Sequence, residues 1–85
     1  MADTIHFNLS NDQMSDVNVN VWDDRTSKQV LDTVPLNQGE SVAVEVVADS
    51  WGKGAAHWTF ASSDGSINSN KRQDGISDGD ECTLG

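Results

Sequence analysis

The stretch Val17-Asn18-Val19-Asn20-Val21-Trp22 is the clearest indication of the fold, because valine alternates in it with side chains of a different kind. Successive side chains of a β-strand point to opposite faces, so a period of two collects the three valines on one face. Branched side chains of this kind suit a pleated, half-buried surface. The stretch therefore predicts a strand of an antiparallel sheet with one buried face and one face in water.

The same period recurs before and after this strand. Residues 5–9 and 42–46 alternate in the same way, and 55–62 predicts a further strand with Trp58 and Phe60 turned inward. Residues 29–34 form a weaker candidate, since Leu31 breaks the alternation. Pro35 lacks an amide hydrogen, so that strand either ends there or lies at a sheet edge. Asn37-Gln38-Gly39 has the composition of a turn.

The stretch 63–81 differs from the rest of the chain. It is acidic, contains three Asp-Gly pairs and has few large apolar residues. We expect it to be rich in loops, with short strands near Ile67 and at 82–84. Residues 69–80 are expected to be the least ordered internal segment, as a mobile or partly disordered loop.

The pattern as a whole predicts one all-β domain over residues 1–85. Six to seven short strands with turns every 8–12 residues indicate a small antiparallel β-sandwich with Greek-key-like connections, and a compact barrel is the alternative. No segment has a sustained helical period. The residues expected to be most buried are Phe7, Val19, Val21, Val44 and Phe60.

Charge and composition limit the functions that the chain can have. Fourteen acidic residues against five basic ones, a formal charge of −9, argue against nucleic acids and anionic membrane surfaces as partners. The sequence has no apolar run long enough to span a membrane and no recognisable signal peptide. The single cysteine, Cys82, has no intrachain partner and is expected to be free. These features favour the cytoplasm, or secretion without a recognisable signal peptide.

One polar patch is the main candidate for a binding site. If the first two strands form a hairpin, His6 and Asn8 lie beside Asn18, Asn20 and Trp22 on one solvated face. Carboxamides donate and accept hydrogen bonds as sugar hydroxyls require, and an indole stacks on the apolar face of a sugar. The alternative is that Trp22 is covered by the following loop and that the asparagines are merely solvated.

Trp51 is the second candidate for a ligand contact. It lies in a loop beside Gly52-Lys53-Gly54, whose glycines permit rearrangement around a ligand. The alternative is that its indole folds back and closes one end of the sandwich.

Metal binding and catalysis find little support in the sequence. No carboxylate run has the ligand spacing of an EF-hand, so we expect no metal or other cofactor, with Ca²⁺ as the alternative that the acidic composition leaves open. The only histidines, His6 and His57, lie within predicted strands, and no motif of a catalytic nucleophile is present. We therefore expect a protein that is not an enzyme.

Two functions from different classes follow. The first is a small noncatalytic module that binds a neutral carbohydrate in the manner of a lectin. The second is an acidic, inhibitor-like interaction domain that binds a basic protein partner. Self-association into a homo-oligomer is compatible with both, since a domain of this size has a small core.

Overall fold

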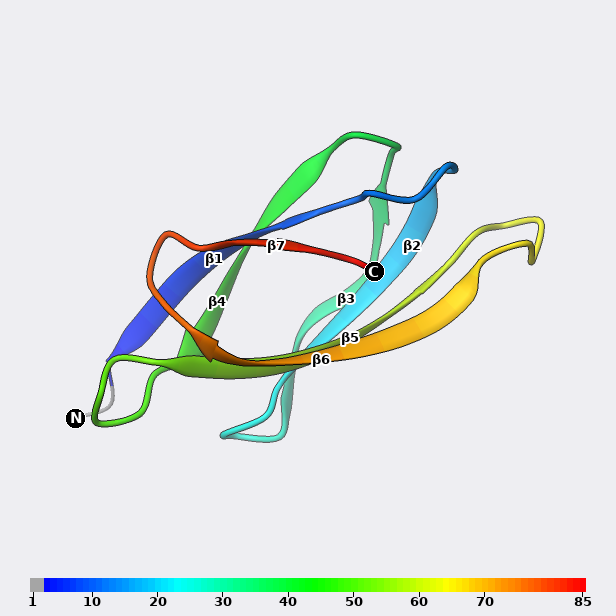
Figure 1. Cartoon of the computed structure of the whole chain (residues 1–85). Coiled ribbons are helices and arrows are strands. Elements are labelled where there is room, and N and C mark those ends of the chain that lie inside the picture. The colour runs from blue at the N-terminus through cyan, green and yellow to red at the C-terminus, as the bar shows by residue number, and fades with distance from the viewer. Residues whose placement is uncertain (1–2) are drawn as a thin grey trace.

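Two β-sheets pack face to face in the computed structural model, which describes residues 3–85 (Figure 1). One sheet has three strands in the order β4-β1-β7, and the other has four in the order β3-β2-β5-β6. All neighbours are antiparallel except β1 and β7. The strands are β1 (Thr4–Ser10), β2 (Val17–Asp23), β3 (Lys28–Leu36), β4 (Ser41–Val47), β5 (Gly54–Ala61), β6 (Asn68–Ile76) and β7 (Glu81–Thr83). Within residues 3–85 the structure has no helix of the length and apolar character needed to cross a membrane. The predicted sandwich is confirmed.

The core lies between the sheets and follows the alternation in the sequence. All five residues expected to be most buried are buried, and Trp58 is completely inaccessible to solvent. Its indole Nε1 donates a hydrogen bond to the carbonyl of Leu84 over 2.9 Å, and its ring lies 6.3 Å from that of Phe7. Trp58 therefore joins the four-stranded sheet to β1 and to the segment after β7.

The expected hairpin between the first two strands is wrong, because β1 pairs with β4 and β7 while β2 pairs with β3 and β5. The six-residue connection between β1 and β2 crosses from one sheet to the other. Asn11 holds this crossing in place: its buried Nδ2 donates to the carbonyls of Ser15 and Leu36, and its Oδ1 accepts the Gln13 amide. A buried carboxamide with these partners satisfies backbone groups of the connection and of the end of β3.

The expectation of a mobile loop at 69–80 is also wrong, since Asn68–Ile76 forms the nine-residue strand β6. This strand pairs with β5 from Ala61 to Gly54 and lies at the edge of its sheet. Main-chain hydrogen bonds to β5 hold it there, and of its side chains only Ile76 is buried. An edge strand of this kind needs few apolar residues, which explains why its sequence has no apolar period.

Strand β3 is the edge strand that Pro35 predicted. Its register with β2 shifts twice, next to Leu31, and Thr33 has a positive φ of 51°. These irregularities accommodate the break in alternation at Leu31, since extra residues in one strand form bulges.

Candidate functional site

The structure separates the six residues of the predicted site into three places. His6 and Asn8 lie on the outer face of the three-stranded sheet. Asn18, Asn20 and Trp22 lie on the outer face of the four-stranded sheet, on the opposite side of the sandwich. The single patch expected from a β1–β2 hairpin is therefore wrong in its composition, because that hairpin does not form.

His6 takes part in a cluster of its own. Its Nε2 lies 3.2 Å from Oε2 of Glu45, and its amide donates to Oδ1 of Asp78 over 2.8 Å. These groups are exposed on the acidic three-stranded sheet.

The outer face of the four-stranded sheet carries three rows of side chains that run across its strands. The register of the strands defines these rows, since residues opposite one another share a face. The first row is Gln29, Trp22, His57 and Arg72; the second is Asn20, Thr59 and Asn70; the third is Pro35, Asn18, Ala61 and Asn68. Only the first row contains ionisable groups. The other two rows form a surface of uncharged amides, a hydroxyl and small apolar groups, which we call the amide face.

Trp22 is half-buried and stacks on His57. The two rings are nearly parallel, at 5°, and their centroids are 5.1 Å apart. Nδ1 of His57 forms a hydrogen bond of 2.5 Å with Oδ1 of Asp24. The other oxygen of Asp24 lies 3.2 Å from Nε of Arg72, without the alignment of a hydrogen bond. This chain of contacts fixes the orientation of the imidazole and, through it, of the indole.

Asn20 has a structural role besides its place on the amide face. Its Oδ1 accepts hydrogen bonds from the Thr33 amide at 2.9 Å and from Nε2 of Gln29 at 3.0 Å. It thereby satisfies backbone at the irregular part of β3. Its Nδ2 donates no hydrogen bond within residues 3–85 and faces solvent as a free donor.

Trp51 is exposed, so the alternative that its indole folds back and closes one end of the sandwich is wrong. Its side chain is 82% accessible, at the tip of the loop between β4 and β5. The loop is held by Asp49, whose Oδ1 accepts the amides of Trp51 and Lys53, each at 2.9 Å. Gly52 has a positive φ of 76°, a backbone conformation that residues with a side chain rarely adopt.

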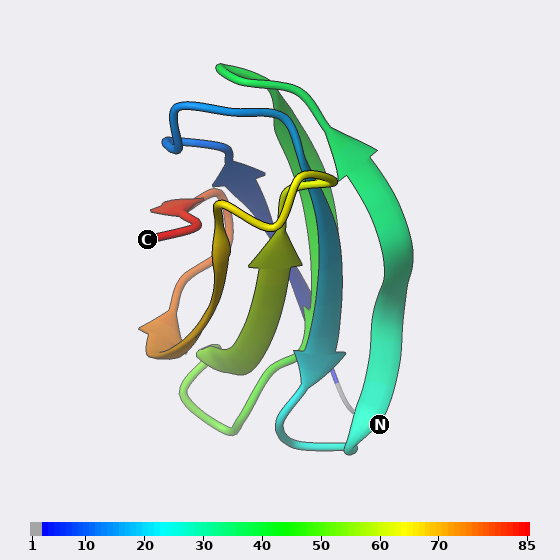
Figure 2. The ribbon, with the colours of Figure 1, turned by 90° about the vertical axis from the view of Figure 1, so that its right-hand side faces the viewer.

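Asp49 also ties this loop to the neighbouring turn. Its Oδ2 accepts a hydrogen bond from Nη2 of Arg25 over 3.0 Å. The amide of Lys53 is the largest cause that lowers the pKa of Asp49 below its usual value of 3.8, and the Trp51 amide and Arg25 act in the same direction. The β2–β3 turn and the β4–β5 loop lie at the same end of the sandwich (Figure 2). An exposed indole is thus presented on a loop of fixed shape.

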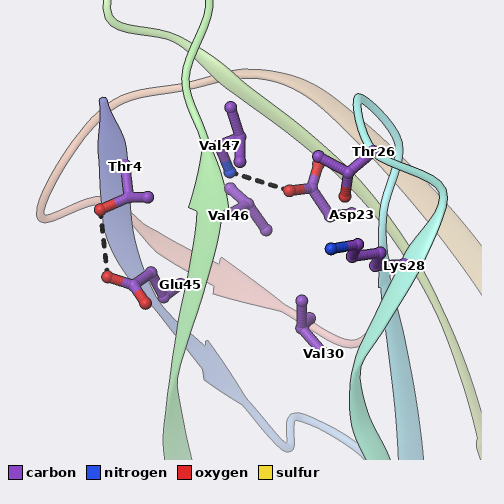
Figure 3. Close-up of a pocket in the computed structure, with 8 residues that line it drawn as sticks. All are labelled: Thr4, Asp23, Thr26, Lys28, Val30, Glu45, Val46 and Val47. Atoms are coloured by element: carbon purple, nitrogen blue, oxygen red, sulfur yellow. Dashed lines mark hydrogen bonds between the residues drawn. The ribbon is translucent and has the colours of Figure 1, made fainter. Parts of the chain in front are cut away.

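A cleft of about 190 Å³ opens between the edge strands β3 and β4 (Figure 3). Val30 and Val46 line it from opposite sheets, with Lys28 and Glu45 also on its wall. Asp23 closes one end. Its side chain is 2% accessible, with Oδ1 accepting the Arg25 amide and Oδ2 accepting the Val47 amide at 2.8 Å. Asp23 therefore links the end of β2 to β4 in the other sheet.

Sequence reasoning missed most of the amide face. The period of β5 indicates that His57 and Thr59 point outward, but only the pairing of β2 with β5 reveals that they lie beside Trp22 and Asn20. Asn70 was missed because residues 69–80 were expected to form a mobile loop, and Asn68 because the short strand expected near Ile67 had no assigned partner. Within residues 3–85, no group of three or more His, Cys, Asp or Glu side chains is arranged to hold a metal ion.

The chain was compared with protein-family models, curated proteins and solved structures, and none of them matches it.

Proposed function

We propose that this protein is a noncatalytic module that binds a neutral carbohydrate, with Trp51 as the stacking residue. The observation that carries the proposal is an indole that is 82% exposed on a loop whose backbone is held by Asp49. A large exposed aromatic side chain lowers solubility and contributes nothing to the core, so a binding role accounts for it best. A rigid loop reduces the entropy lost when a ligand is bound.

The amide face supports the choice of a neutral sugar. Its amides, from Asn18, Asn20, Asn68 and Asn70, offer donors and acceptors without charge, and they lie beside the fixed ring of Trp22. A phosphorylated or acidic sugar is disfavoured by the formal charge of −9. Trp22 contributes less stacking area than Trp51, because it is half-buried and one side of its ring is covered by His57.

A glycan array of neutral oligosaccharides, displayed at high density, tests the proposal directly. High density matters because a site with one fully exposed indole binds a single sugar weakly and gains from multivalency. The sugar identified on the array is then titrated in solution while tryptophan fluorescence is recorded.

The variant Trp51→Ala should lose the sugar-dependent fluorescence change and bind at least about tenfold more weakly, the effect of losing roughly 1.4 kcal/mol of contact. Met14→Ala is the matched control, since Met14 is 88% exposed in the β1–β2 loop at the other end of the sandwich (Figure 2). Its affinity should equal that of the unmodified protein. Equal binding by Trp51→Ala and the unmodified protein would refute the role of Trp51.

A further inference from the structure

The four sheet edges of the sandwich differ in how they are protected from pairing with another chain. Strand β3 has two register shifts and Pro35, β6 carries Lys71 and Arg72 together with a register shift, and β7 is only three residues long. Bulges, proline, charged residues and short length are the usual devices that block edge pairing. Strand β4 has seven residues, no register shift and no proline.

The free hydrogen-bonding groups of β4 can be identified from its pairing with β1. The Ala48 amide donates to the carbonyl of Asp3, whereas the Val47 amide points the other way, to Asp23. Backbone groups alternate in direction along a strand, so the amides and carbonyls of Ala43 and Glu45 point away from β1. Within residues 3–85 no strand pairs with that side of β4.

The cleft beside this edge fits the side chains of an added strand. Val30 and Val46 provide apolar walls for the residues of a guest strand that point inward (Figure 3). Glu45, the one charged residue of β4, is held by Thr4 Oγ1 at 3.0 Å and by His6 at 3.2 Å. Both partners belong to β1, so the Glu45 side chain is directed away from the free edge.

Charge indicates what kind of strand would pair. None of the five lysines and arginines stands on β1, β4 or β7, whereas Glu45, Glu81 and the turn residues Glu40, Asp78 and Asp80 surround their outer face. Lys28, on β3, is the one basic residue that lines the cleft. A second copy of this chain would bring another formal charge of −9 to the same edge, which disfavours self-pairing.

From these observations we propose that β4 is a docking edge for an extended basic peptide segment of another protein. The segment adds as a strand beside β4, pairs with the backbone of Ala43 and Glu45, and places alternate apolar side chains in the cleft. Its basic side chains then face the acidic outer surface. This mode of recognition takes affinity from main-chain hydrogen bonds and selectivity from alternate side chains. The site is separate from Trp51 and does not depend on the carbohydrate proposal.

The probe is a synthetic peptide of alternating lysine and valine, with a glutamate–valine peptide as its charge control. Amide hydrogen exchange, followed residue by residue by NMR, is the main measurement. The lysine–valine peptide should slow exchange at Ala43 and Glu45, whose amides face the free edge. It should leave Val44 unchanged, since that amide is already paired with β1. The glutamate–valine peptide should have no effect.

Variants at Ala43 separate docking from folding. Ala43→Lys keeps the amide but adds like charge, and it should weaken binding of the basic peptide about tenfold; Ala43→Glu should not weaken it. Ala43→Pro removes one edge donor and should also cost about tenfold. If Ala43→Pro fails to fold, the lysine and glutamate variants still decide the proposal.

Three results would overturn the proposal. The first is no protection at Ala43 and Glu45 under saturating lysine–valine peptide. The second is equal binding of both peptides. The third is a dimer in sedimentation experiments that Ala43→Pro dissociates, which would assign this edge to a second copy of the chain.

Discussion

The two sheets of this sandwich share one core but present opposite surfaces. The four-stranded sheet shows uncharged amides and a stacked Trp22–His57 pair, and both of its edges are protected. The three-stranded sheet shows carboxylates around His6 and leaves the edge of β4 open. Alternation places the core side chains of β1, β2, β4 and β5, so the two outer surfaces differ in residues that do not face the core.

The comparison shows how an 85-residue domain can present two different outer surfaces. A sandwich buries one face of each sheet, and the other two faces are then free to differ in charge and shape. The sheets are held together by one hydrophobic core and by a few hydrogen bonds that cross between them, and removing these contacts tests the comparison most severely.

The largest effect is expected for Trp58→Ala. Trp58 is completely buried between the sheets and bonds to the Leu84 carbonyl, so its loss leaves a large cavity and an unpaired acceptor. The free energy of unfolding should fall by about 4 kcal/mol, measured by urea denaturation. A loss below about 1 kcal/mol would mean that the core is not shared in the way described.

The next largest effect is expected for Asp23→Ala, which cuts the link between β2 and β4. Two backbone amides, of Arg25 and Val47, lose their acceptor, and the free energy of unfolding should fall by about 3 kcal/mol. Asp32→Ala is the control, since Asp32 is exposed on β3, and it should change stability by less than about 0.5 kcal/mol. Equal stability of the two variants would contradict the linking role of Asp23.

A smaller effect is expected for the stacked pair on the four-stranded sheet. In a double-mutant cycle with Trp22→Ala and His57→Ala, the coupling energy should be about 1 kcal/mol in favour of stacking. His6→Ala with Glu45→Ala is the matching cycle on the three-stranded sheet. The coupling energy between His6 and Glu45 should be smaller than that between Trp22 and His57, because His6 and Glu45 are exposed to solvent.

The smallest effect on stability is expected when the pH is lowered and Asp64, in the turn before β6, becomes protonated. Hydrogen bonds from the Ser62 hydroxyl first, and from Ser66, lower the pKa of Asp64 from 3.8 to about 2. The folded state thus favours the ionised form, so the turn stabilises the protein above pH 4 and loses this contribution as the pH falls towards 2. Asp64→Asn should remove that part of the pH dependence of unfolding. If the free energy of unfolding depends on pH in the same way for the unmodified protein and for Asp64→Asn between pH 5 and 2, this role of Asp64 is contradicted.

Much of the fold can be read from the sequence residue by residue. The alternation of Val17, Val19 and Val21 predicted which side chains enter the core, and Pro35 predicted an edge or an end for its strand. These are local properties, because the pleat of a strand turns each side chain to a definite face whatever its neighbours are. The outward positions of Asn18, Asn20 and Trp22 follow from the same rule.

Which strands pair, and therefore which residues form a site, is known only from the tertiary structure. Alternation does not specify which strand a given strand pairs with. It could not reveal that the chain crosses between the sheets at Asn11, which places His6 and Asn8 on the opposite side of the sandwich from Trp22. Nor could it reveal that β6, which has no apolar period, is held as a strand by the backbone of β5. The direction of Trp51 was likewise undetermined, because it depends on the hydrogen bonds that Asp49 makes within its loop. The face of the sheet on which a side chain lies follows from the local geometry of the strand, whereas the pairing of strands depends on contacts between residues far apart in the chain.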